Sequence, residues 1–279
     1  MKSKLKRVFI LVAVWYLILL AAVGIYFVKV LGFGMATAGM LLSALLPLAF
    51  YLGLNVATVA RAAIRQIAFT IIILAGTLMP LASLHEVGWP VVAMYAGGFM
   101  FWVLYLFWYA VLELPDSPYL QTGKVLPELT FETPEGNTFY CSQLLGKKVV
   151  YLFYRGNWCP VDMAQIRELS RQYSDLQERG AEVLLISPQP PEKTSELAAK
   201  LSAAFVFLTD CENRMARLLG IEHPEGVPLG FGMSQYRKDT VLPTVVITDE
   251  QGRIIYVDRT NNYLIRPEPE ELIEAVARA

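Results

Sequence analysis

Long apolar stretches in the first 112 residues constrain this chain more than any other feature of its sequence. Residues 8–30 are apolar apart from Lys29, and comparable stretches cover 35–60, 66–84 and 90–112. About 20 apolar residues are enough for an α-helix to cross the hydrocarbon core of a bilayer. The sequence therefore predicts a membrane domain of four transmembrane helices at 1–114, and the 55% hydrophobic content of the chain fits that prediction.

Basic residues close to the apolar stretches predict their orientation. One group precedes the first stretch and another lies between the second and third stretches: Lys2, Lys4, Lys6 and Arg7, then Arg61 and Arg65. Because short cytosolic loops are enriched in Lys and Arg, four crossings place both ends of the chain in the cytosol. The first apolar core is too long for a cleaved signal peptide, so we expect a retained helix in a multi-pass protein of the plasma membrane, the inner membrane in a bacterium.

Charge divides the chain in the same place as hydropathy. Seven of the 24 Lys and Arg residues and one of the 25 acidic residues, Glu86, lie within 1–112, which gives +6 there and −7 downstream. An acidic C-terminal part argues against nucleic acid as a partner.

The scarcity of ionisable residues in the spans weakens another interpretation, a small-molecule transporter with a regulatory domain. The small residues Gly97 and Gly98 favour helix packing over a ligand pathway.

A second domain is expected at 124–279, after a polar, proline-containing linker at 115–123. Its pattern predicts a hairpin at 129–132 and 138–140, followed by a strand at 148–154, a helix that ends at Gly180 and a strand at 182–186. A helix at 192–202, a strand at 205–208 and a helix at 213–219 come next. The last predicted elements are strands at 245–248 and 253–257 and a final helix from 267. Residues 222–239 show no periodicity and predict a long loop. Strand–helix–strand order predicts parallel pairing, so we expect an α/β domain with a mixed central sheet and helices on both faces.

Cys159 lies where the predicted strand 148–154 meets the following helix. A thiol at a helix N-terminus is favoured as an anion by the unpaired backbone N–H groups and by the helix dipole, and the cation Arg155 would add to this. Pro160 suits the first helical position. Cys159 is therefore a candidate nucleophile, and the alternative is a small cysteine that fills a gap in the core.

The run YLFYRGNWCPVDMAQIREL, at 151–169, resembles the active-site segment of the alkyl hydroperoxide reductase and thiol-specific antioxidant group, in its peroxiredoxin-like branch. Segments at 180–188, 208–210, 242–244 and 262–270 agree in the same order. The resemblance covers about 124–279 and implies a thioredoxin fold. It also implies a site that includes Pro243 and Thr244, with a cis proline at 243 facing the cysteine.

Asp162 stands where the resembled pattern Cys-Pro-x-Cys has its second cysteine, so this chain cannot form that disulfide. A carboxylate in the same helical turn would repel a Cys159 thiolate and raise the pKa of the thiol. Asp162 could relay protons, although a helix-end carboxylate is more often a cap or a solvated charge.

Cys141 and Cys211 are the other two cysteines, and both lie in the second domain. Either could resolve a sulfenic acid formed on Cys159, and buried packing is the alternative for each. His223 is expected at the polar surface. No motif predicts a metal site or a cofactor.

These observations favour a membrane-anchored, thiol-dependent oxidoreductase that uses Cys159 to reduce a peroxide or to exchange with a protein disulfide, with an external thiol as reductant. The rival interpretation is a non-catalytic thioredoxin-like domain that binds or scaffolds a partner from a membrane anchor, since Asp162 has replaced the second cysteine. In both readings the N-terminal domain holds the second domain at the lipid bilayer.

Overall fold

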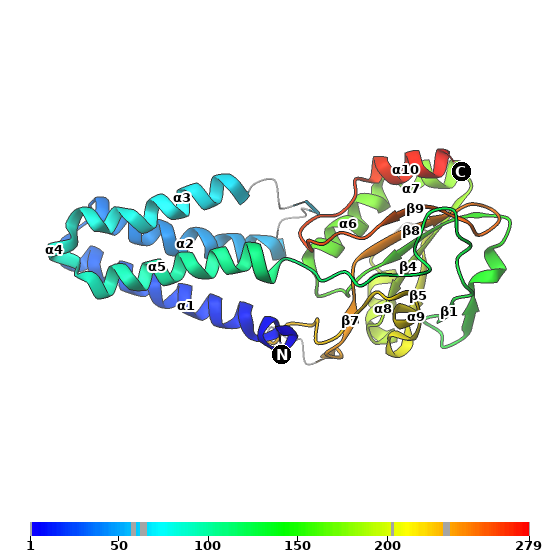
Figure 1. Cartoon of the computed structure of the whole chain (residues 1–279), viewed down its shortest axis with the longest axis horizontal. Helices are drawn as coiled ribbons and strands as arrows, with labels where there is room; N and C mark the ends of the chain where they lie inside the picture. Colours follow the sequence, from blue (N-terminus) through cyan, green and yellow to red (C-terminus); the bar gives the residue numbers. More distant parts are fainter. Residues whose placement is uncertain (1, 57–59, 62–65, 202–203, 231–234, 279) are drawn as a thin grey trace. The chain divides into compact units, whose positions relative to one another are not determined.

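The computed structural model describes residues 2–56, 60–61, 66–201, 204–230 and 235–278. Parts of the sequence-based predictions therefore lie outside the described residues: the end of the second span at 57–59, the basic residue Arg65, residue 202 at the end of a predicted helix, and 231–234 in the predicted loop. The chain forms two compact units, one made of Lys2–Ala57 and Arg61–Val111 and the other of Leu112–Ala279 (Figure 1).

The first unit is a helical bundle. Its α-helices are α1 (Lys2–Leu31), α2 (Met35–Val56), α3 (Gln66–Leu78), α4 (Leu84–Val87) and α5 (Trp89–Leu104). A 3-10 turn, η2 (Met79–Ser83), joins α3 to α4, and a π-helical turn, η3 (Tyr105–Tyr109), extends α5.

Four helical segments within the described residues are long and apolar enough to cross a membrane: Ser3–Leu31, Met35–Leu54, Gln66–Val87 and Trp89–Tyr109. Large apolar side chains point outward from them, and Ile67 and Phe107 are 75% and 76% exposed. A water-soluble bundle would bury such side chains, so this surface is compatible with insertion into a membrane.

Glycines in the bundle lie where helices approach closely. A Cβ at Gly39 would lie 2.6 Å from the carbonyl oxygen of Gly76, and a Cβ at Gly97 would lie 2.7 Å from the hydroxyl of Tyr16. That hydroxyl donates a hydrogen bond to the carbonyl oxygen of Met94. The packing role expected for Gly97 is therefore confirmed.

The second unit is built on a seven-stranded mixed sheet in the order β2-β1-β5-β4-β3-β8-β9. The strands are β1 (Thr130–Glu132), β2 (Thr138–Tyr140), β3 (Lys148–Phe153), β4 (Ala181–Ser187), β5 (Val206–Thr209), β8 (Thr244–Thr248) and β9 (Ile254–Asp258). β3 pairs in parallel with β4 and β4 with β5, whereas β8 and β9 run antiparallel to their neighbours. The predicted parallel strand–helix–strand unit and both predicted hairpins are confirmed.

Helices follow the strands along the chain: α6 (Pro160–Arg171), α7 (Tyr173–Glu178), α8 (Pro191–Ala198), α9 (Arg214–Leu219) and α10 (Pro269–Ala277), with 3-10 turns η4 (Cys141–Leu144) and η5 (Cys211–Asn213). Figure 1 shows α6, α7 and α10 grouped along one side of the sheet. Their apolar side chains pack with alternate residues of the central strands, among them Val150, Leu152, Val183, Leu185 and Ile247. Alternation along a strand puts these residues on one face, which forms the core.

Two predictions about this unit are corrected. The helix expected to run to Gly180 breaks at Gln172, whose φ of −110° and ψ of 17° are not helical, so α6 and α7 are separate. Residues 222–239 were expected to lack regular structure, but β6 (Glu222–His223) pairs with β7 (Thr240–Val241) in a small second sheet. Two-residue strands are too short to leave a periodic pattern in a sequence.

Candidate active site at the β3–α6 junction

The junction between β3 and α6 holds Cys159 at the N-cap of the helix, with an extended backbone (φ −88°, ψ 109°). The Cys159 N–H donates to the carbonyl oxygen of Gly156 at 3.0 Å, and the Cys159 carbonyl accepts from Met163. Gly156 has φ +141°, and a Cβ there would lie 2.8 Å from Nε1 of Trp158. The tight turn that presents Cys159 therefore requires glycine at this position.

The sulfur of Cys159 lies in the interior, because the residue is only 1% exposed. Burial raises the pKa of the Cys159 thiol to about 11, the Asp162 carboxylate raises it further, and the Arg155 and Arg266 cations and the N–H of Asp162 oppose them. The lowered pKa expected from the helix dipole and Arg155 is therefore wrong, whereas the expected opposing effect of Asp162 is confirmed. In this conformation the thiol is protonated at neutral pH because desolvation outweighs the nearby cations.

Asp162 is completely buried and paired with Arg266. Its Oδ1 accepts hydrogen bonds from Nη2 and Nε of Arg266 at 2.6 and 3.1 Å, and its Oδ2 accepts from the backbone N–H of Arg155 at 2.7 Å. Asp162 is thus neither a solvated charge nor a cap of its own helix. It ties the β3–α6 junction to the segment before α10.

Arg266 is a site residue that motif reasoning missed. Its Nη1 donates to the carbonyl oxygens of Tyr263 and Ile265, so the hydrogen bonds of its guanidinium hold it rigidly beside Asp162. The only sequence signal for it was its place inside the family-like segment 262–270. The pair joins residues 104 positions apart in the sequence, so only the tertiary structure brings them together.

Arg155 is 5% exposed, with its guanidinium 4.6 Å from the ring centroid of Trp158 and 5.5 Å from that of Tyr263. Its Nη2 donates to the carbonyl oxygen of Gly226 at 2.7 Å, and its own carbonyl accepts from Thr240 at 2.7 Å. The cation thus lies within reach of two aromatic rings and acts on Cys159, and such contacts stabilise a buried arginine.

Pro243 and Thr244 lie at the start of β8, and Thr244 is directly opposite Phe153, the last residue of β3. The expected cis proline is not found, because the peptide bonds of the described residues are trans, including Leu242–Pro243. The trans form of an X–Pro bond is intrinsically favoured. Here it carries the chain directly from β7 into β8, and the Thr244 hydroxyl donates to the carbonyl of Leu242 at 3.0 Å.

Cys141 and Cys211, the possible resolving cysteines, are free thiols in this structure, as is Cys159. Burial, followed by the charge of Glu128, raises the pKa of Cys141 to about 12. The Cys211 thiol donates to the Glu132 carboxylate at 2.7 Å, and burial and this contact raise its pKa to about 11. Each therefore has an acidic neighbour other than Asp162, and their role as resolving cysteines stays a prediction.

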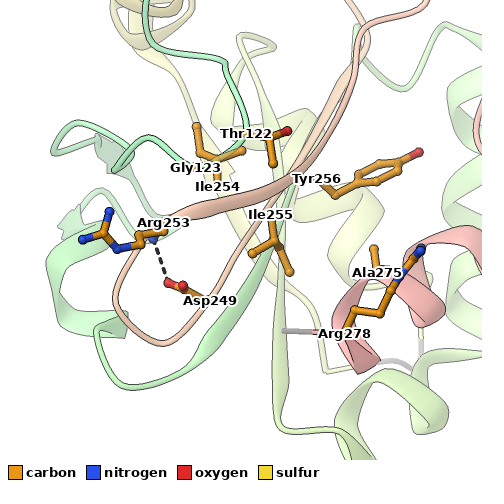
Figure 2. A pocket seen from close by; sticks show the side chains of 9 residues that line it. All are labelled: Thr122, Gly123, Asp249, Arg253, Ile254, Ile255, Tyr256, Ala275 and Arg278. Carbon is orange, nitrogen blue, oxygen red and sulfur yellow. Dashed lines mark hydrogen bonds between the residues drawn. The ribbon is translucent and has the colours of Figure 1, made fainter.

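Other features do not extend this site. His223, expected at the polar surface, is half-buried in β6 beside Gly226. No group of three or more His, Cys, Asp or Glu side chains that could hold a metal ion occurs among the residues that the structure describes. An open hollow of about 500 Å³, shown in Figure 2, is lined by Ile254, Tyr256, Arg278 and neighbouring residues and includes none of the side chains described above.

Comparison with known proteins shows similarity to one family. Residues 122–257 match the AhpC/TSA family. The chain is 29% identical over 99 residues to "Peroxiredoxin Q, chloroplastic" of Populus jackii, which covers 36% of this chain and 46% of that protein. It is 26% identical over 102 residues to "Peroxiredoxin Bcp" of Escherichia coli (strain K12), which covers 37% of this chain and 65% of that protein.

Among solved structures, the crystal structure of peroxidoxin BcpB from Mycobacterium tuberculosis aligns with a TM-score of 0.47 and 17% identity, over 57% of this chain and 97% of that chain. The matched region spans about half to two thirds of the length of the two curated relatives. Together with the mixed sheet and the helix that begins at Pro160, the family match supports a thioredoxin-fold, peroxiredoxin-like C-terminal domain that is similar to the AhpC/TSA family.

Proposed function

We propose that this protein is a membrane-anchored, peroxiredoxin-like thiol oxidoreductase in which Cys159 is the reacting group. The observation that carries the proposal is the position of Cys159 at the N-cap of α6, with two arginines, Arg155 and Arg266, that both favour its thiolate. A helix N-terminus and nearby cations are the features that stabilise a thiolate and the negative charge that develops when it reacts.

The proposed reaction begins when the Cys159 thiol loses its proton and attacks the terminal oxygen of a peroxide. The O–O bond breaks, the sulfur is oxidised to a sulfenic acid, and the peroxide leaves as an alcohol or water after taking up a proton. An external thiol then condenses with the sulfenic acid to give a mixed disulfide and water. A second external thiol attacks that disulfide, which restores the Cys159 thiol and releases the oxidised reductant.

An external reductant is needed because Asp162 stands where a second sulfur of the same turn would be. A carboxylate cannot form a disulfide, and Asp162 is already engaged by Arg266 and by the backbone of Arg155. Protein disulfides are the second substrate class in this proposal, since the same thiolate can attack a disulfide sulfur. The helical unit would hold the domain close to lipid hydroperoxides or to a partner in the bilayer.

The buried sulfur implies that the domain has a closed and an open form. At 1% exposure Cys159 is inaccessible to a peroxide, so the β3–α6 junction has to open before reaction. Opening would also return water to the sulfur and lower the pKa of the thiol, because desolvation is the largest cause of its increase.

The test compares the full chain in detergent with its Cys159→Ser variant. The parent should consume peroxide in the presence of a dithiol, and a sulfenic-acid-specific probe should label Cys159. The Cys159→Ser variant should do neither while keeping the unfolding temperature of the parent. Equal peroxide consumption by the two proteins would refute the proposal.

A second candidate function is a non-catalytic binding or scaffold module on a membrane anchor. It is favoured by the burial of the sulfur and by the raised pKa of its thiol, to about 11. The same probe separates the two candidates: a parent that stays unlabelled at Cys159 under excess peroxide, and consumes none, would be a binding module.

A further inference from the structure

We propose that Gln189 is a positioning residue that holds the loop at 155–159 in its closed form and so controls access to Cys159. This inference rests on the proposed function, in which Cys159 is the group that reacts. Gln189 belongs to no motif in the sequence. Its role follows from hydrogen bonds that connect the segment just after β4 to the loop after β3.

The side-chain amide of Gln189 forms two hydrogen bonds with Asn157. Its Oε1 accepts from the backbone N–H of Asn157 at 2.9 Å, and its Nε2 donates to Oδ1 of Asn157 at 3.0 Å. Asn157 lies two residues before Cys159. β3 and β4 are parallel neighbours, so the segments that leave their C-terminal ends adjoin. Gln189 lies two residues beyond the end of β4 and reaches the loop from there.

The side-chain amide of Gln189 is held in place by further contacts with buried hydroxyl groups. Gln189 is 3% exposed, and its Nε2 also lies 2.9 Å from the hydroxyl of Tyr154 and 3.3 Å from that of Thr194. Asn157 completes the connection to this region, because its Nδ2 donates to the carbonyl oxygen of Lys193 at 2.6 Å. Displacing the loop would leave several of these polar groups without partners, and this favours the closed form.

The rest of the loop is held by different groups. Arg155 is bonded through its N–H to Asp162 and through its carbonyl to Thr240, and the Cys159 N–H is bonded within the loop to Gly156. Gln189 therefore holds the middle of the loop, at Asn157, in its closed position. If its side chain is removed, we expect the segment between Arg155 and Cys159 to open while its first residue stays anchored.

Opening of the loop should lower the pKa of the Cys159 thiol. The charged groups that act on Cys159 are Arg155, Asp162 and Arg266. Their hydrogen bonds with one another, with Gly226 and with Thr240 do not involve Gln189, so we expect all three to stay in place in the variant. What changes is the contact of the sulfur with water. Exposure favours the thiolate, and each unit by which the pKa falls gives about ten times more thiolate at a pH below it.

The experiment measures alkylation of each cysteine in the full chain in detergent, over a range of pH, by mass spectrometry of the peptides. In Gln189→Ala we expect the alkylation midpoint of Cys159 to fall and its rate at neutral pH to rise about tenfold. The buried Cys141 serves as an internal control and should keep the rate of the parent. An unchanged rate at Cys159 would overturn the proposal, and so would a parallel rise at Cys141, because that would report global opening.

Two further variants make the test specific. Asn157→Ala removes the side-chain hydrogen bonds of Asn157 but keeps its backbone N–H, which still donates to Oε1 of Gln189. It should therefore increase Cys159 alkylation by a smaller factor than Gln189→Ala. Gln172→Ala is the matched control, since Gln172 makes an exposed hydrogen bond to Glu270 at 2.6 Å, and it should leave Cys159 alkylation unchanged. Alkylation needs no peroxide. A parent that is inert to peroxide would therefore refute the proposed function, whereas only the alkylation rates decide the role of Gln189.

Discussion

Asp162 and Arg266 are 104 residues apart in the sequence and form a buried ion pair, in which two guanidinium nitrogens contact one carboxylate oxygen at 2.6 and 3.1 Å. The side chains are 0% and 1% exposed. The pair lies in the first turn of α6, three residues from Cys159. It places a carboxylate near the sulfur and joins the β3–α6 junction to the chain segment that leads into α10.

Removing the charge of Asp162 should destabilise the C-terminal domain strongly. Asp162→Asn leaves the buried Arg266 cation unpaired, and breaking such a pair costs about 3–5 kcal/mol. Denaturant unfolding of the full chain in detergent measures the loss. Lys147→Gln is the matched control, because it breaks the exposed Lys147–Glu182 pair (2.7 Å), whose contribution should be below about 1 kcal/mol. Equal losses in the two variants would contradict the structural role of the buried pair.

The same Asp162→Asn substitution should make Cys159 easier to ionise. The Asp162 carboxylate raises the pKa of the Cys159 thiol, whereas Arg155 and Arg266 lower it, so the variant keeps only the charges that favour the thiolate. We expect the pH midpoint of Cys159 alkylation to move down in the folded variant. A midpoint that stays in place, or moves up, would show that Asp162 does not act on the sulfur.

Stability should fall at alkaline pH, in part because of Cys159. The pKa of its thiol is about 11 in the folded chain and about 8.5 in an unfolded one. A group whose pKa is raised on folding contributes its full stabilisation below the unfolded value and loses it as pH rises through the folded value. Between these values the parent should lose about 1.4 kcal/mol more per pH unit than Cys159→Ser. Unfolding free energies measured at several alkaline pH values check this, and parallel pH curves would disprove it.

A second sulfur in the first turn of α6 should change the redox chemistry of the site. Asp162→Cys places a thiol three residues from Cys159 and beside Arg266, whose cation should lower the pKa of the new thiol. Under mild oxidation we expect a disulfide within this turn, seen as loss of alkylation at both positions that a reductant restores. Asp162→Ser removes the same carboxylate without adding sulfur, so its Cys159 alkylation should be the same before and after oxidation. If Cys159 is alkylated equally in both oxidised variants, the two positions are not within reach of each other.

The orientation predicted from the basic residues can be read from Cys211. This cysteine is partly exposed, whereas Cys141 and Cys159 are buried, so a membrane-impermeant thiol reagent should report on Cys211 alone. With the C-terminal domain in the cytosol, labelling should occur only after the cells are permeabilised. Labelling of Cys211 in intact cells would place the domain on the opposite side.

Local pattern was enough for much of the architecture. Runs of about 20 apolar residues, the apolar strand before Cys159 and the helical spacing after it depend on neighbours within one or two turns. The elements α1 and β3 and the start of α6 are where the pattern predicts them. The position of Cys159 at the start of a helix follows from the same local information, because Pro160 and the end of the preceding strand are adjacent to it.

Tertiary structure alone decided the electrostatics of the site. The hydrogen bonds of Asp162 with Arg266 and of Asn157 with Gln189 join residues that only the sheet brings together, so no local pattern encodes them. The burial of Cys159 likewise depends on the packing of the whole domain, and it reverses the pKa shift that the helix end and Arg155 predict. The sequence by itself determined which residues stand at the junction of β3 and α6, and the packed domain determined their charge and access, because desolvation and ion pairing depend on distances in space.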